Sequence, residues 1–218
     1  GHTFGEENVG LYQLVFPVYA LGISFSCAGT ELALSRCVAQ ENAAGHPEKA
    51  KELLKTGLIF TFVLSCILTI FLQHNAHMTA ISFLHDSRCE ELLILLSYTF
   101  PFASIHSCIC GYSLGLKQTK IPAVSQLFEQ TFRILFVFLF CYYRTSHQLD
   151  LSISFAVVGL AMGEIFASCY CLYSIHHTAS KQVQNLLSAS TFCIHLSRLF
   201  RHAFPLTASR VLLNILQS

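Results

Sequence analysis

The sequence has few charged side chains. Asp, Glu, Lys and Arg make up 11% of its 218 residues, whereas an ordinary soluble domain carries about 25%. So small a share of charges does not cover the surface of a water-soluble globule of this size. The hydrophobic content of 53% and the mean hydropathy of +0.55 therefore predict a membrane protein. The same hydrophobicity excludes a disordered chain.

An excess of positive charge is also missing. The formal net charge is +1, which disfavours a nucleic-acid partner. The sequence contains no Gly-rich phosphate loop, no nucleophile elbow, no HExxH helix and no dinucleotide-binding loop. We therefore expect a protein that is not an enzyme, holds no cofactor and does not use nucleotide hydrolysis.

Cysteine is frequent, with ten residues, and most of these lie in or beside apolar runs, where they act as small hydrophobic side chains. The pairs Cys108-x-Cys110 and Cys169-x-Cys171 lack the two-residue gap of a zinc knuckle or a thioredoxin motif. We therefore expect no metal or redox site there. We also interpret three histidines as solvated loop residues rather than metal ligands: His74, His77 and His85.

Long uncharged runs dominate the chain. Residues 8–30, 56–85 and 92–116 contain no Asp, Glu, Lys or Arg. A helix of about 20 residues crosses a bilayer core about 30 Å thick, and helices satisfy every backbone group in lipid. Strict alternation, which a β-barrel requires, is absent from runs such as ILFVFLFCYY. We therefore predict an all-α, polytopic transmembrane helix bundle with five spans: 9–38, 53–73, 91–116, 121–143 and 151–175.

A polar segment, a further apolar run, two prolines and two small-residue motifs add detail to this pattern. Residues 182–197 are uncharged but polar, and we predict a loop or a short interfacial helix there. A sixth apolar run begins near Leu199 and reaches the end of the sequence, so we expect a fragment of a longer polytopic protein. Pro17 and Pro101 are expected to kink their spans. Two small-residue motifs predict close helix packing within one molecule: Gly111-x-x-x-Gly115 and Gly159-x-x-x-Gly163.

The distribution of Lys and Arg predicts the orientation in the membrane. Alternate loops carry nine of these residues, and the opposite loops carry two, Arg88 and Arg144. Basic residues accumulate on the cytoplasmic side, so the loops with nine are expected there. The nine residues are Arg36, Lys49, Lys51, Lys55, Lys117, Lys120, Lys181, Arg198 and Arg201.

Charges inside the spans are the candidates for function. Each costs about 2.5–3.5 kcal/mol at the bilayer centre on insertion scales, so such residues normally face a protein interior or a watery cavity. Glu129 and Arg133 are four residues apart and share one helix face. The pair either lines a polar cavity for a charged or sugar-bearing substrate or only ties helices together. The other charges in or near spans are Glu31, Arg36, Glu164 and Arg210.

Several segments, in order along the chain, resemble one family of membrane proteins. These segments are GLYQLVFPV at 10–18, LSRCVA at 34–39, NAAG at 42–45, GYSLGL at 111–116, SQLFEQ at 125–130 and FPLTASR at 204–210. Through them the sequence resembles the stage V sporulation protein B-like, polysaccharide biosynthesis (oligosaccharide flippase) family of the multidrug/oligosaccharidyl-lipid/polysaccharide exporter superfamily.

This resemblance implies a protein of two helical lobes around a central cavity. Residues 1–198 would form the N-terminal lobe without its first helix, and residues 199–218 would begin the second lobe. The implied activity is the flipping of an undecaprenyl-linked sugar, a peptidoglycan or polysaccharide precursor, across the bacterial cytoplasmic membrane by alternating access. Arg36, Arg133 and Arg210 would bind pyrophosphate through their planar guanidinium groups. The supporting or ion-coupling residues would be Glu31, Glu129 and Glu164.

Two other functions fit part of this pattern. A cation-coupled multidrug exporter of the same superfamily would favour a cavity with net negative charge, which three arginines in or near the membrane argue against. A non-transporting membrane scaffold would use the buried charges only to set helix register. The expected partners are a lipid-linked precursor, membrane lipids and a coupling cation.

The orientation is testable by cysteine labelling. In a cysteine-free background, Lys117→Cys is expected to resist an impermeant thiol reagent in intact cells, whereas Ser87→Cys is labelled from outside. The reason is the bias of Lys and Arg towards the loops at 43–51 and 117–120 and away from those at 74–90 and 144–150. Labelling of Lys117→Cys in intact cells would reverse the assignment.

Overall fold

The computed structural model describes residues 6–146, 154–179 and 189–217, and over these ranges every regular element is a helix. The predicted all-α bundle is therefore confirmed. The elements are α1 (Glu6–Ile23), a π-helical turn η1 (Ser24–Ala28), α2 (Gly29–Ala43), α3 (Pro47–His74), α4 (Ala76–Ser82), α5 (Cys89–Ser97), α6 (Phe100–Gly115), α7 (Lys120–Ser146), α8 (Ser154–Ala179) and α9 (Ala189–Gln217).

Several helices are long and apolar enough to cross a membrane. Four qualify among the described residues, and a fifth span results if the bent pair α5 and α6 is counted as one. The protein is thus a multi-pass membrane protein. The four helices are Gln13–Ala43, Pro47–His74, Lys120–Phe140 and Val157–His177, and the bent pair is Cys89–Ser97 with Phe100–Gly115.

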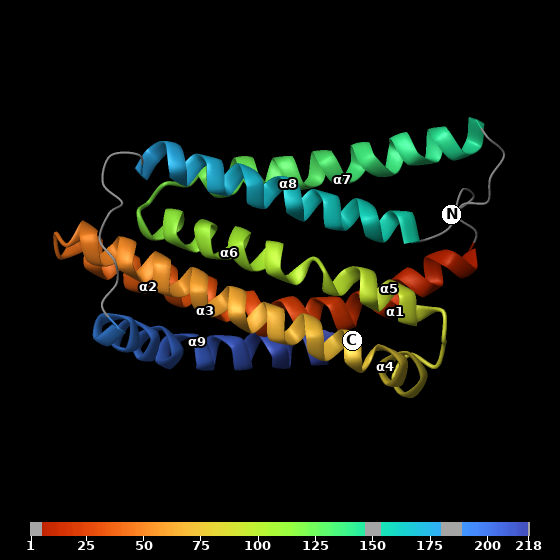
Figure 1. Cartoon of the computed structure of the whole chain (residues 1–218), viewed down its shortest axis with the longest axis horizontal. Coiled ribbons are helices and arrows are strands. Elements are labelled where there is room, and N and C mark those ends of the chain that lie inside the picture. Colours follow the sequence, from red (N-terminus) through yellow and green to blue (C-terminus); the bar gives the residue numbers. More distant parts are fainter. Residues whose placement is uncertain (1–5, 147–153, 180–188, 218) are drawn as a thin grey trace.

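The helices run roughly along one direction (Figure 1). α7 and α8 lie side by side along one face, α2, α3 and α9 lie along the opposite face, and α6 lies between these groups. The turn from α2 to α3 and the turn from α6 to α7 are at one end of the bundle, and α4 is at the other. The two turns predicted to be cytoplasmic therefore share one end, while their orientation towards the cytoplasm stays a prediction.

Irregularities interrupt two of the spans. α1 continues through Pro17 and passes into the π-helical turn, where the Ser26 hydroxyl donates to the Gly22 carbonyl oxygen at 3.0 Å. Such turns leave backbone groups imperfectly paired and often mark functional sites. α5 and α6 meet at 43°, and Pro101 lies in the first turn of α6, where its missing N–H costs little. The span predicted around Pro101 is thus two helices.

The helix α9 starts earlier than the sequence suggested. Of the segment predicted as a loop or a short interfacial helix, residues 182–188 lie outside the described residues. Residues 189–197 are helical, but they are the first part of the long helix α9 and not a separate short helix. Its first turns pack against α2 and α3, and Arg198 forms an ion pair with Glu41 of α2. Glu41 thus provides an ionic partner for Arg198 in the polar N-terminal part of α9. The division of the chain into two lobes stays a prediction.

Glycine permits the helix backbones around α6 to touch. A Cβ added at Gly111 would lie 2.6 Å from the carbonyl oxygen of Glu31, and one added at Gly115 would lie 2.7 Å from that of Ser35. Both distances are too short for real atoms, so α6 approaches α2 only because these positions lack a side chain. The predicted small-residue motif therefore packs within the molecule.

Substitution of these glycines tests the close approach. Gly111→Ala and Gly115→Ala are each expected to lower stability by about 1–3 kcal/mol, because the added methyl group must push backbones apart. Gly10→Ala is the matched control, since nothing lies within 4 Å of its added Cβ. Melting in detergent measures all three. Equal melting temperatures for the Gly111 and Gly10 variants would contradict the packing.

Candidate functional site

A polar cavity of about 250 Å³, open on one side, lies between the helices of the bundle. Its walls come from four parts of the chain that are distant in sequence: the segment from α1 to α2, α6, α7 and α8. Three carboxylates, one histidine and several small polar groups face it, which is unusual for the interior of a membrane protein. The lining residues are Ile23, Cys27, Glu31, Ala103, His106, Ser107, Cys110, Pro122, Gln126, Glu129 and Glu164.

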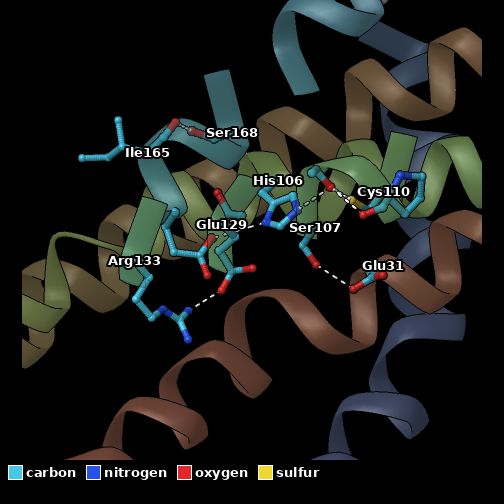
Figure 2. Close-up of polar contacts among 12 residues, drawn as sticks. Glu31, His106, Ser107, Cys110, Glu129, Arg133, Ile165 and Ser168 are labelled. Atoms are coloured by element: carbon cyan, nitrogen blue, oxygen red, sulfur yellow. Dashed lines mark hydrogen bonds and ion pairs between the residues drawn. The ribbon is translucent and has the colours of Figure 1, made fainter. Parts of the chain in front are cut away.

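Glu31 enters the cavity from the first turn of α2. Its Oε2 accepts a hydrogen bond of 2.9 Å from the Ser107 hydroxyl of α6 (Figure 2). The contact depends on the glycine-mediated approach of the two helices, because Gly111 of α6 lies against the backbone of Glu31. The packing of α2 against α6 thus places the Glu31 carboxylate and its partner Ser107 together in one wall of the cavity.

His106 of α6 joins three helices. Its Nδ1 lies 3.3 Å from Oε2 of Glu164 in α8, and its Nε2 lies 3.0 Å from the Ser125 hydroxyl in α7. The Glu164 side chain is only 10% exposed, so His106 supplies a polar partner that a buried carboxyl group needs. This histidine is therefore the central polar contact of the site.

Glu129 and Arg133 form the ion pair that their spacing predicts. Arg133 Nη2 donates to Glu129 Oε1, and both residues lie on α7. Arg133 Nε is buried and has no hydrogen-bond partner among the described residues. α8 packs closely here, since a Cβ added at Gly163 would lie 2.8 Å from the carbonyl oxygen of Glu129. This second glycine contact brings Glu164 beside the α7 pair.

The predicted site residues divide into two groups. Glu31, Glu129 and Glu164 all line the cavity, so the structure brings these three together. Arg133 pairs with Glu129 but is not a lining residue, and Arg36 is an exposed residue of α2. The side chain of Arg210 lies outside the described residues. Among the side chains that the structure describes, the lining thus contains carboxylates without an arginine.

Sequence reasoning missed His106. The run at 92–116 is uncharged because it contains no Asp, Glu, Lys or Arg, and that definition passes over its histidine. The partners of His106 lie on other helices, so no spacing within the run points to them. The available signal was its position: an ionisable residue near the middle of a predicted span is a candidate for function in its own right.

Ser125, His106 and Glu164 lie in the order of a hydrolytic triad, yet they are poorly placed for acyl transfer. Ser125 is completely buried, is not a lining residue and donates to the Pro122 carbonyl oxygen at 2.9 Å. A substrate carbonyl group therefore cannot reach its oxygen, as nucleophilic catalysis requires. The arrangement is better suited to holding protons or cations and to hydrogen bonding with hydroxyl-rich groups.

Removal of His106 tests its central position. His106→Ala leaves the buried Glu164 carboxyl group without this partner and is expected to cost roughly 1–3 kcal/mol of stability or more. His77→Ala is the control, because the side chains of the His77–Glu90 pair are 68% and 35% exposed, and its loss is expected to cost at most about 1 kcal/mol. Thermal melting in detergent separates the two. Equal effects would mean that His106 contributes no more than a surface histidine.

The fold matches a known membrane transporter. A solved structure described as the inward-facing conformation of a multidrug resistance MATE family transporter of the MOP superfamily superposes with a TM-score of 0.70. The match covers 97% of this chain and 48% of that chain at 16% sequence identity, which shows a shared fold.

Curated relatives support the resemblance found in the sequence. Stage V sporulation protein B of Bacillus subtilis (strain 168) is 27% identical over 213 residues, which is 97% of this chain and 41% of that protein. Lipid II flippase MurJ of the same organism is 27% identical over 141 residues, or 61% of this chain and 26% of that protein. The chain thus spans less than half the length of each relative. A family model described as polysaccharide biosynthesis protein matches residues 2–218, and the chain belongs to this family, as the sequence predicted.

Proposed function

We propose that this chain forms one lobe of a transporter that flips a lipid-linked sugar across the bacterial cytoplasmic membrane by alternating access. The substrate would be an undecaprenyl-linked peptidoglycan or polysaccharide precursor. The observation that carries the proposal is the polar cavity within a bundle of membrane-spanning helices. The family and its curated flippase relative support the same class of substrate.

The cavity provides chemistry that a sugar headgroup needs. Glu31, Ser107 and Gln126 offer hydrogen-bond donors and acceptors to hydroxyl groups. Its volume of about 250 Å³ is below the roughly 300–1,000 Å³ of a typical ligand pocket. A complete site would therefore need a second wall, which a second lobe would supply on alternating access.

Arg133 is the leading candidate for binding pyrophosphate. It pairs with the cavity acid Glu129, and 30% of its side chain is exposed, so part of the guanidinium side chain is accessible to a ligand. A guanidinium group binds phosphate oxygens with a planar fork of donors. Arg36, an exposed residue of α2, and Arg210, whose side chain lies outside the described residues, would complete the pyrophosphate-binding group. The glutamates would hold Arg133 in place or take part in ion coupling.

A cation-coupled multidrug exporter is the second candidate. The acidic lining favours it, because Glu31, Glu129 and Glu164 create a negative environment suited to a cation. A non-transporting scaffold is the third, in which the same contacts would only set helix register. Reconstitution in vesicles separates these three. Flipping of a fluorescent lipid-linked sugar supports the first, cation-driven uptake of a cationic dye supports the second, and a folded but inactive protein supports the third.

Substitutions of Arg133 test the proposal in cells. In the natural open reading frame that encodes this chain, Arg133→Ala is expected to abolish complementation of a flippase-deficient strain. Loss of hydrogen bonds to a charged group weakens binding by roughly 10-fold to 100-fold. Arg133→Lys keeps the charge without the planar fork and is expected to complement partly.

Arg88→Ala is the matched control. Arg88 pairs with Asp86 in the segment before α5 and is not a lining residue of the cavity, so its loss is expected to leave complementation intact. Membrane levels are measured in parallel by immunoblotting. Normal accumulation and full complementation by Arg133→Ala would exclude a role of this residue in transport.

A further inference from the structure

Three potential metal ligands meet beside the cavity. The ligand atoms of His106, Cys110 and Cys171 all lie within 4.8 Å of one another. Both cysteines are buried free thiols, and neither has a role in the proposed transport. Thiolate sulfur and imidazole nitrogen are the ligands that Zn²⁺ prefers in proteins.

Helix geometry explains why these three residues meet. His106 and Cys110 are four residues apart on α6 and therefore share one face, as the two histidines of a zinc-binding helix do. Cys171 approaches from α8. By contrast, the two cysteines within each C-x-C pair are about 200° apart around a helix, so they cannot hold one ion together. One cysteine of each pair contributes to the cluster.

The imidazole of His106 is held in the orientation that a metal ligand needs. Its Nδ1 faces the Glu164 carboxylate at 3.3 Å, while its Nε2 faces Ser125, whose hydroxyl is also 3.5 Å from Cys110 Sγ. Metal-binding histidines usually donate their second N–H to a carboxylate, which fixes the tautomer and leaves the other nitrogen free to bind. Glu164 provides that carboxylate here.

We propose that His106, Cys110 and Cys171 form a buried binding site for a soft divalent metal ion, with Zn²⁺ as the best match. Tetrahedral Zn²⁺ places sulfur and nitrogen ligands about 3.5–3.8 Å apart, so small side-chain rotations close the site. The Ser125 hydroxyl or a water molecule from the cavity takes the fourth position.

The charges of this site balance. Each thiol loses one proton on binding, and the two protons pass to water through the cavity, which Cys110 lines. With the ion bound, His106 is neutral: it donates from Nδ1 to Glu164 and binds the metal through Nε2, and the proton that Nε2 carries without the ion leaves to water by the same route. Two thiolates and Zn²⁺ sum to zero, which suits an apolar interior, whereas Cu⁺ would leave a net negative charge. The bound ion would link α6 to α8 at the wall of the cavity.

A second cluster competes for the same ion. His106, Glu129 and Glu164 also offer ligand atoms within 4.8 Å of one another. The thiol cluster is favoured for a soft metal, because the carboxylates already have Arg133 and His106 as partners. The two clusters predict different ligands, sulfur in one and oxygen in the other, which an experiment can distinguish.

The test uses the natural full-length protein in detergent, with an affinity tag that contains no histidine. After Zn²⁺ loading and dialysis, a single equivalent of zinc is expected by elemental analysis. X-ray absorption is expected to show sulfur at about 2.3 Å and nitrogen at about 2.0 Å. Co²⁺ in place of Zn²⁺ is expected to give thiolate-to-metal charge-transfer absorption. These measurements need no mutation, so a folding defect cannot obscure them.

Single substitutions then locate the site. Cys110→Ala and Cys171→Ala each remove a proposed ligand. Loss of a residue that only hydrogen-bonds to a ligand weakens metal binding by roughly 10–100-fold, and each of these variants is expected to weaken zinc binding by more than that. The controls are Cys108→Ala, a buried residue of α6 that contacts Thr61, and Cys169→Ala, an exposed residue of α8. Both controls are expected to bind zinc normally. Absence of bound zinc in the folded protein, a shell of oxygen and nitrogen only, or equal binding by folded Cys110 and control variants would overturn the proposal.

Discussion

Every carboxyl group inside the membrane must find a polar partner within the protein, and much of the bundle is organised around this requirement. Glu31 is bonded to Ser107, Glu129 to Arg133 and Glu164 to His106. Two of these partners come from a different helix, so helices that carry charges must approach closely. An unpaired charge facing lipid would instead cost several kcal/mol.

Glycine makes that approach possible. Gly111 puts α6 against the backbone of α2 beside Glu31, and Gly163 puts α8 against the backbone of α7 beside Glu129. The close helix contacts and the charged residues therefore lie at the same positions along the helix axes. Aromatic rings strengthen the α7–α8 pair on another side, where Phe132 and Phe166 stack with centroids 4.1 Å apart. A polar cavity remains where α2, α6, α7 and α8 turn their polar faces inward.

His106 connects the two proposed sites. One ring nitrogen contacts the cavity acid Glu164, and the other faces the group formed by Ser125, Cys110 and Cys171. A ligand on either side would change the hydrogen bonding available to the other, because a single imidazole serves both. The acidic cavity lining and the neighbouring thiols also differ in the cations they suit, hard ions and protons in the first case and soft metals in the second.

The sequence by itself determined the membrane class, the helical architecture, the family and the Glu129–Arg133 pair. These depend on composition, on the length of apolar runs and on spacing within one helix, all of which are local properties. Only the tertiary structure decided that His106 is the central contact, that Cys110 meets Cys171, that α9 begins at Ala189 against α2, and that the described cavity lining contains acids without arginine. Those features arise between helices far apart in the chain, and no local spacing encodes which faces meet.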